Sequence, residues 1–529
     1  MKKTLYLGKI LTLEEPLYAQ AMLVEDGTIS AVGTEQELLA LVDSDTAVVR
    51  LGENVMMPAF IDGHSHFSAC ANAMFQVPLA ETLSFDEIGQ RIQKHIKDQQ
   101  VPAGKFVVAQ GYDHNHLKEK AHPTKEFLDR IAPNNPLVLQ HQSGHMGVMN
   151  SLALKVLGVT PETKAPDGGM IGKQNGELTG YMEENAFLYY LRQVPMPSME
   201  ELLQAFEKTQ QMYASYGITT VQEGMLVEQL AHLYQPLLQQ KRLWLDVVGY
   251  GDINAADSLK QLLAGYLKNY KDHFRLGGYK IFLDGSPQGR TAWMLHPYYN
   301  AADGYCGYPT MTDQGVEDAI RLSAAEGMQL LAHCNGDAAA EQYISAAERV
   351  AEGTDRLKSI KPVIVHAQLT TPAQLERAHR LGMMPSFFVA HIYHWGDVHI
   401  LNFGLQRAQE ISAAGSAQRM GMPFSFHQDS PVIPPDMLET IWCAVSRTTE
   451  EGVMLGKDQR LTVLQALQAV TIHAAYQYSE QEKKGSITVG KQADLVILSA
   501  DPLEVPTESI RDIQVLETIK DGKTVYKKQ

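Results

Sequence analysis

Short apolar segments alternate with longer amphipathic ones along most of this chain, which predicts repeated strand–helix units. Eight apolar segments have the length and composition of strands buried on both faces of a parallel sheet, namely 55–61, 218–222, 243–248, 279–283, 329–332, 362–365, 383–388 and 423–426. Apolar residues recur at helical spacing between most of them, namely in 199–216 and in about 313–327, 337–352, 371–381 and 404–420. Eight such units predict an α/β chain folded as a (β/α)8 TIM barrel.

Both ends of the chain show a different pattern, in which short strands are joined by tight turns. Asp-Gly pairs at 26–27 and 521–522 lie between apolar runs, and glycine accepts the positive φ that such turns require. Neither end has enough residues to bury a core of its own. We therefore expect 1–57 and 476–529 to build one composite β-sandwich domain, and 58–475 to form the barrel.

The first and second predicted barrel strands are separated by about 150 residues, which is far more than one helix requires. This spacing predicts a large insertion over the barrel mouth at about 67–198. The insertion carries strand candidates of its own at 106–110 and 137–140.

Composition and charge narrow the class of protein. Hydrophobic residues make up 44% of the 529 residues and charged residues 20%, which is typical of globular rather than disordered chains. The formal net charge of −16 disfavours binding to the negatively charged phosphate backbone of nucleic acids, so we expect no nucleic-acid partner. The apolar runs are too short to cross a bilayer and the N-terminus lacks a signal-peptide core, so we expect no membrane association. Four widely spaced cysteines without a CxxC pair favour a cytoplasmic protein.

A His-x-His pair ends the first predicted barrel strand. Because side chains alternate along a strand, His64 and His66 point the same way and can share one metal ion or cluster. Two surface histidines at a strand end are the alternative interpretation.

Other polar residues stand at the ends of later strands. His333 ends the fifth strand, His366 ends the sixth, and Asp429 follows the eighth, while Lys280 lies in the fourth. Each residue alone has an ordinary alternative as a hydrogen-bonded core histidine, a surface lysine or a helix cap. Because the carboxyl ends of barrel strands converge on one cavity, the set as a whole predicts a metal site.

At these positions the chain resembles the metal-dependent amidohydrolase superfamily. The nearest branch is the one with N-substituted formamide deformylases and related uncharacterised amidohydrolases. The resemblance covers nearly the whole chain and rests on these segments: 58–66, 141–154, 279–290, 333–338, 366–368, 429–430 and 485–494. It implies the barrel fold with a β-domain from both ends, and it implies little about the substrate.

The resemblance also implies one or two divalent ions, zinc first, with manganese, iron and nickel compatible. The implied ligands are His64, His66, Lys280, His333, His366 and Asp429. Lys280 would bridge two ions after carboxylation by CO2, since a free ammonium cannot ligate a metal. A salt-bridged Lys280 beside a mononuclear site is the alternative. Asp429 would also take a proton from the attacking water and pass it to the leaving nitrogen.

Five further residues are candidates for substrate binding: His145, Asp113, Arg290, Trp293 and His391. Arg290 and Trp293 lie on the loop after Lys280, where a barrel enzyme keeps specificity groups. His391 belongs to an aromatic-rich segment after the seventh strand, which suggests an apolar or ring-bearing leaving group. Ordinary loop packing is the alternative for His145 and His391.

These observations favour a metal-dependent hydrolase that cleaves a non-peptide C–N bond, foremost the amide of an N-acyl or N-formyl amine. One alternative is a hydrolytic deaminase with one metal, which the presence of Lys280 disfavours. Another is a non-catalytic binding or regulatory protein on the same scaffold. The expected partner is a small-molecule substrate, and superfamily habit suggests a homodimer. His427 and Gln428 stand where the superfamily often has Gly-Ser before the final aspartate, which predicts altered surroundings for Asp429.

Overall fold

The computed structural model describes residues 3–80, 82–195, 197–299, 301, 303–353 and 356–529. The chain divides into two compact units. One unit comprises Met1–Ser68 with Glu207–Gln529, and the other is Ala69–Phe206.

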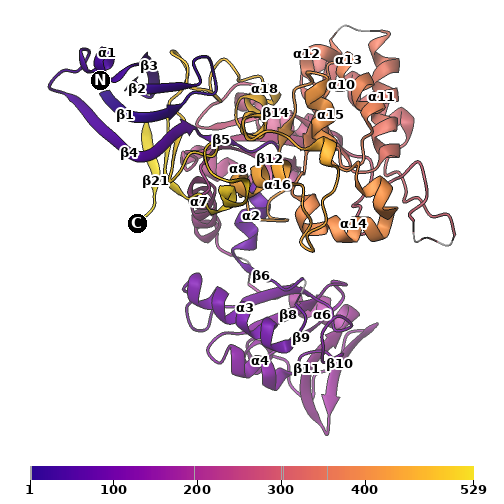
Figure 1. Ribbon diagram of the computed structural model, residues 1–529. Coiled ribbons are helices and arrows are strands. Elements are labelled where there is room, and N and C mark those ends of the chain that lie inside the picture. The colour runs from indigo at the N-terminus through magenta and orange to yellow at the C-terminus, as the bar shows by residue number, and fades with distance from the viewer. Residues whose placement is uncertain (1–2, 81, 196, 300, 302, 354–355) are drawn as a thin grey trace. The chain divides into compact units, whose positions relative to one another are not determined.

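The larger unit is built around an eight-stranded parallel sheet (Figure 1). In sheet order its strands are β18 (Ser425–Phe426), β17 (Met384–Phe387), β16 (Val363–His366), β15 (Gln329–Cys334), β14 (Phe274–Phe282), β13 (Asp246–Asp252), β12 (Ile218–Leu226) and β5 (Phe60–Ile61). The Gly63 N–H donates to the Phe426 carbonyl at 3.2 Å, which links the first strand to the last. The prediction of a TIM-barrel-like domain is thereby confirmed.

Helices follow most of these strands: α7 (Met199–Ser215), α8 (Glu228–Gln239), α9 (Ala256–Leu262), α10 (Asp313–Glu326), α11 (Asp337–Ala351), α13 (Pro372–Arg380), α14 (His391–Ala408), α15 (Ala414–Arg419), α16 (Met437–Ser446), α17 (Val463–Ala469) and α18 (Ile472–Gln477). Their ends follow from local sequence. For α10, the Thr312 side chain accepts from Gly315 N–H at the start, and Gly327 takes a left-handed conformation at the end.

Two sequence-based boundaries need correction. The segment 404–420 was predicted as one helix, but α14 ends at Ala408 and α15 begins only at Ala414. The first barrel strand was predicted at 55–61, but β4 (Thr46–Pro58) belongs to a different sheet and only β5 pairs with β12. The backbone changes sheets at Ala59, whose N–H donates to Asp494 while the next residue bonds Gly217. The residues before and after Ala59 are equally hydrophobic, so the hydrophobic pattern alone does not show where the backbone passes from one sheet to the other.

The two chain ends meet in one seven-stranded mixed sheet, drawn in indigo and yellow in Figure 1. Its order is β21 (Lys523–Lys527), β20 (Val515–Lys520), β19 (Leu495–Leu498), β4, β1 (Lys3–Leu11), β2 (Tyr18–Glu25) and β3 (Thr28–Gly33). Alternate residues fill cores on its two faces: Tyr6 and Met22 on one, Leu5 and Leu23 with Leu38 of α1 (Glu35–Leu39) on the other. The two-sheet sandwich stays a prediction, since the described residues form this single sheet.

The smaller unit has its own six-stranded sheet. In order its strands are β10 (Gly169–Gln174), β11 (Glu177–Glu183), β9 (Met146–Met149), β8 (Leu137–His141), β7 (Val107–Tyr112) and β6 (Gln76–Pro78). The associated helices are α3 (Phe85–Asp98), α4 (Lys125–Ile131), α5 (Ser151–Val156) and α6 (Glu184–Leu191), with α2 (Phe67–Ala73) at its first boundary. The predicted strands at 106–110 and 137–140 correspond to β7 and β8. Two buried apolar clusters lie within this unit, so it carries a core of its own.

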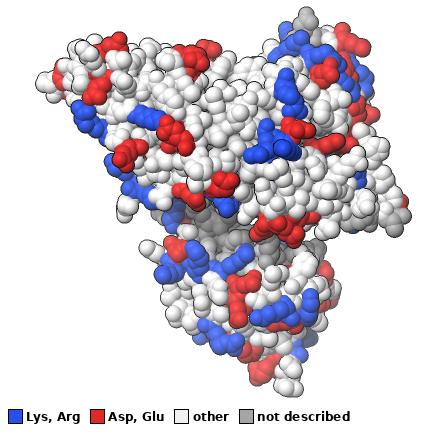
Figure 2. Space-filling view, in the orientation of Figure 1, with Lys and Arg blue, Asp and Glu red and all other residues white. Residues whose placement is uncertain are grey.

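The surface is charged with both signs. On the face shown in Figure 2, basic and acidic side chains are interspersed. None of the described helices combines the length and the hydrophobicity that a bilayer crossing requires.

Candidate metal centre

Six polar side chains gather at the carboxyl ends of the barrel strands. The residues are His64 and His66 after β5, Lys280 in β14, His333 in β15, His366 at the end of β16, and Asp429 after β18. The structure brings together all six residues for which the sequence predicted metal binding, and the rule that barrel strands converge at one end accounts for it.

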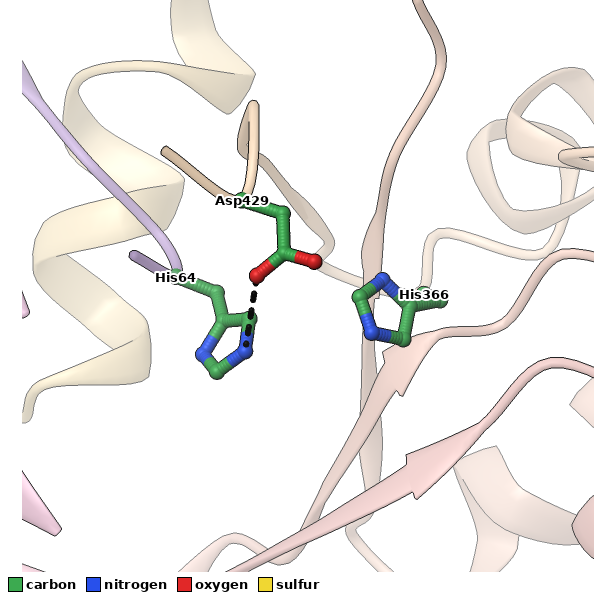
Figure 3. A group of neighbouring side chains, drawn as sticks. All are labelled: His64, His366 and Asp429. Carbon is green, nitrogen blue, oxygen red and sulfur yellow. Dashed lines mark ion pairs between the residues drawn. The ribbon is translucent and has the colours of Figure 1, made fainter. Parts of the chain in front are cut away.

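The closest group consists of His64, His366 and Asp429, whose ligand atoms all lie within 4.8 Å of one another (Figure 3). Asp429 Oδ1 lies 3.5 Å from His64 Nε2 and 3.3 Å from His66 Nε2. Lys280 Nζ lies 3.2 Å from the same His64 nitrogen. The ring of His333 joins this group through His366, at 4.5 Å between ring centroids.

The tautomer of His64 follows from its contact with Gln222 in β12. The Gln222 amide nitrogen donates to Gly63 O and to Tyr478 Oη, both at 2.9 Å, so its oxygen faces the imidazole. That oxygen lies 2.5 Å from His64 Nδ1 and accepts its proton. His64 therefore presents the lone pair of Nε2 to the centre, as a metal-binding histidine does.

His333 is oriented in the same way by a buried carboxylate. Its Nδ1 lies 3.1 Å from Asp284 Oδ1. The Asp284 carboxylate also accepts backbone N–H groups from Asn335, Gly336 and Trp293, at 3.0, 2.6 and 3.1 Å. This fixed acceptor places the proton of His333 on Nδ1 and leaves Nε2 for the centre.

His427 is a member of the cluster that sequence reasoning assigned only to the surroundings of Asp429. Its Nε2 lies 3.1 Å from His366 Nδ1, and its Nδ1 lies 3.0 Å from Ser386 Oγ. Because the Ser425 hydroxyl donates to Ser386 at 2.8 Å, a chain of buried hydrogen bonds runs from β18 to His366. His427 thus fixes the orientation of the His366 ring.

The backbone is held in uncommon conformations where it presents these ligands. His366 has φ of 71° and Asp429 has φ of 54°, in a left-handed region that few residues other than Gly adopt. Close packing is also required beside His64, since a Cβ on Gly224 would lie 2.6 Å from His64 Cε1. Strain of this kind persists only where surrounding structure enforces it, and it is typical of functional sites.

Burial shifts the pKa of the central groups. Desolvation lowers the pKa of Lys280 to about 7, although Asp429 opposes the shift. Burial by itself raises the pKa of Asp429, but contact with His66, followed by His427 and Lys280, outweighs it and holds that pKa below its usual range. Desolvation first, then neighbouring cationic groups, keeps the pKa of His64 well below its ordinary value. At neutral pH the centre therefore offers the neutral imidazole of His64, the carboxylate of Asp429 and the partly neutral amine of Lys280.

This donor set suits a divalent transition ion. Imidazole nitrogens and a carboxylate oxygen are the ligands that zinc and its neighbours prefer. Asp429 Oδ1 is buried, and among the described residues it accepts no hydrogen bond of good geometry, although two imidazoles face it. A cation held by His64, His366 and Asp429 would satisfy that oxygen.

The candidates for substrate binding fall into two groups. Arg290 and Trp293 follow β14, and the Trp293 N–H donates to the same Asp284 carboxylate that orients His333. His391 is the first residue of α14 rather than part of a loop, and its ring lies 4.5 Å from Phe388.

The other two, Asp113 and His145, belong to the smaller unit. His145 is largely exposed and its Nδ1 lies 3.2 Å from Glu184. Asp113 is buried, and its carboxylate contacts three histidines of its own unit, His114, His116 and His141.

Sequence reasoning missed Gln222, Asp284 and His427 as groups that orient the metal-site histidines. All three lie at or just after the carboxyl end of a predicted strand, so the convergence rule that selected His333 would also have selected them.

Comparison with known proteins agrees with this architecture. The sequence pattern of the amidohydrolase family matches residues 47–526. The N-substituted formamide deformylase of Arthrobacter pascens is 28% identical over 96% of this chain and 95% of its own. The protein YtcJ of Bacillus subtilis is 27% identical over all of both chains. Among solved structures, an uncharacterised metal-dependent hydrolase from Pyrococcus furiosus has a TM-score of 0.74 at 23% identity, covering 95% of this chain and 100% of its own.

Proposed function

This chain belongs to the amidohydrolase family, and on that premise we propose that it hydrolyses the amide bond of an N-acyl or N-formyl amine. The family and the deformylase relative support a metal-dependent hydrolase acting on C–N bonds other than peptide bonds. The similarity to an N-substituted formamide deformylase over nearly the full length of both chains supports the narrower substrate class.

The observation that carries the proposal is the group of His64, His366 and Asp429, with three ligand atoms within 4.8 Å. Bound here, a divalent ion, which we take to be zinc, would make hydroxide available near neutral pH and polarise the scissile carbonyl. Because its pKa lies below the ordinary value, Asp429 is ionised at neutral pH and can accept a proton from the attacking water. It then delivers that proton to the leaving nitrogen as the C–N bond breaks.

Lys280 is proposed to become carboxylated. Burial lowers its pKa to about 7, so a large share of the side chain is a neutral amine at neutral pH. That amine attacks CO2, a nitrogen–carbon bond forms, and one proton is released to give a carbamate anion. The carbamate has two oxygens with which to bridge two cations, whereas an ammonium group has no lone pair to offer. With [13C]bicarbonate, we expect a carbamate resonance that Lys280→Ala removes. Lys361→Ala is the matched control, because burial lowers that pKa as well.

The aromatic residues around His391 support an apolar or ring-bearing amine as the leaving group. The His391 ring lies 4.5 Å from both Phe388 and Trp395, and Phe388 lies 5.3 Å from His427 of the metal centre. A continuous row of rings therefore extends outward from the cluster. Arg290, whose guanidinium lies 5.6 Å above the Tyr298 ring, is proposed to contact the polar part of the substrate.

A panel of N-formyl and N-acyl amines tests the proposal. Chromatography should detect the free amine and the carboxylic acid in equal amounts. Amides that carry an aryl or alkyl group on nitrogen should be hydrolysed faster than unsubstituted amides, which release ammonia. Asp429→Asn should lower turnover by about 10²- to 10⁴-fold, while Asp318→Asn on the exposed face of α10 should retain it. Ammonia released without an acid would identify a deaminase instead. No turnover of any member by the metal-loaded chain would reject the substrate class.

A further inference from the structure

A second group of metal-ligating side chains lies in the smaller unit, at the carboxyl ends of two neighbouring strands. Asp113 and His114 directly follow β7, and His141 is the last residue of β8. We propose that these three side chains bind a divalent transition-metal ion, separate from the barrel centre.

The three ligand atoms form a triangle of the right size. His114 Nδ1 lies 3.2 Å from His141 Nε2, and Asp113 Oδ1 lies 3.5 Å from His141 Nε2 and 3.8 Å from His114 Nδ1. Zinc bonds to imidazole nitrogen and carboxylate oxygen are about 2.0–2.1 Å long, so the edge of a tetrahedral ligand set is about 3.3 Å. The observed edges bracket this value, and small side-chain adjustments would equalise them.

The surroundings hold each ligand in place. Asp113 Oδ1 accepts the backbone N–H and the side-chain amide of Asn115, at 2.9 and 3.1 Å. The His122 ring stacks on His114 with 4.1 Å between centroids, and its Nδ1 lies 2.8 Å from Tyr112 Oη. Such outer contacts are what orient metal ligands in known sites.

The proton on His141 must change nitrogen when the ion binds. The backbone N–H of Ser143 donates to His141 Nδ1 at 3.1 Å, which leaves the proton on Nε2, facing His114. With Nε2 on the metal, the proton moves to Nδ1, where the Ser143 hydroxyl oxygen at 3.0 Å accepts it. This change of tautomer moves a proton within one ring, so no proton is gained or lost overall.

The chemistry of the ligands selects the class of ion. Two imidazoles and one carboxylate favour zinc, cobalt or nickel over calcium or magnesium, which prefer oxygen ligands. The His114 side chain is 28% exposed, so water can reach the remaining coordination positions. The ion would join the segment after β7 to the segment after β8.

Metal counting in the full, tag-free chain tests the site. The chain is stripped with chelator and dialysed to equilibrium against buffered zinc, and zinc is measured by elemental mass spectrometry. We expect His114→Gln and His141→Gln each to hold about one equivalent less than the unchanged chain. His95→Gln on α3, in the same unit, should hold as much as the unchanged chain. The double variant His64→Asn/Asp429→Asn should lose the barrel metal and keep this one, so failure of either site is seen separately.

A measurement without substitutions covers the possibility that a variant does not fold. Histidine acylation by diethyl pyrocarbonate, mapped residue by residue, should show His114 protected by zinc and His95 unaffected. Equal zinc content in His114→Gln and His95→Gln would overturn the proposal. So would equal acylation of His114 with and without zinc.

Discussion

The barrel and the smaller unit each bring histidines and an aspartate together, and they do so by different means. In the barrel, His64 and His366 are 1% and 3% exposed, and the partners of their second nitrogens come from distant parts of the sequence. In the smaller unit, His141 is fixed by Ser143 two residues away, and His114 remains partly exposed. The barrel cluster therefore depends on the whole fold, whereas the cluster in the smaller unit depends on two adjacent loops.

This difference suggests different tasks. Long-range partners and uncommon backbone conformations at His366 and Asp429 fix the geometry before any ligand arrives, which is what catalysis requires. Local partners around Asp113 and His114 tolerate adjustment, which suffices for an ion that joins two segments. The two clusters should therefore respond unequally to equivalent changes.

The largest expected difference follows from removing the aspartate of each cluster. Asp429→Asn removes the carboxylate proposed to move the proton, and loss of such a group costs about 10²- to 10⁴-fold in rate. Asp113→Asn, the same change in the smaller unit, should alter kcat by less than about tenfold, because Asp113 is proposed to bind an ion outside the barrel. Steady-state kinetics on the best substrate of the amine panel measures both. Comparable losses of kcat in the two variants would contradict the division of tasks, and circular dichroism serves as the folding control.

Removal of the groups that orient the histidines should give a second, smaller contrast. Gln222→Met deletes the oxygen that accepts from His64, and loss of such an outer partner typically costs about 10- to 100-fold in metal affinity. Ser143→Ala should weaken zinc at the smaller unit by less than about tenfold, since water can replace the exposed hydroxyl.

Chelator competition measures each affinity with the other site disabled. For Gln222→Met the background is His114→Gln, and for Ser143→Ala it is His64→Asn/Asp429→Asn. An equal loss at both sites would mean that long-range partners confer no special rigidity on the barrel centre.

The sequence predicted the barrel because its strands are short, apolar and separated by amphipathic helices, and buried parallel strands require that pattern. It also indicated His333, His366 and Asp429, since each lies at or shortly after the end of a strand. It could not supply the tautomer of His64, because that depends on Gln222, which is 158 residues away. The strand crossing at Ala59 was missed because both sheets bury equally apolar residues on either side.

The cluster in the smaller unit was recognised only in part. Asp113 was expected to contact substrate, and His114 carried no metal assignment. His114 and His141 are 27 residues apart, and only the parallel pairing of β7 with β8 places them together. The pairing of two strands and its register cannot be predicted from the spacing of residues along one strand.

Binding of zinc should slow hydrogen exchange locally in the smaller unit. A ligand present at 100 times its dissociation constant stabilises the folded state by about 2.7 kcal/mol, or about 100-fold in exchange governed by opening of the site. In the Asp429→Asn variant, zinc should slow hydrogen exchange at the backbone amides of residues 113–116 and 141–145. In the double variant that also carries His114→Gln, zinc should no longer slow it. If zinc slowed these amides equally with and without His114, the ion would not be acting through this cluster.

The smallest expected effect concerns His122, whose ring stacks on His114. Burial, followed by His114 and His141, lowers its pKa to about 4, so between pH about 6.5 and 4 the unfolded chain binds more protons at this residue than the folded chain. Stability of the smaller unit therefore falls as pH falls through that window. His122→Phe keeps a stacked ring without a titrating group and should make the fall shallower, by less than one proton because the ring is partly exposed. All four tryptophans lie outside residues 69–206, so their fluorescence follows the barrel unit as an internal control while circular dichroism follows both. A change confined to the tryptophan signal would assign the pH dependence to the barrel histidines instead.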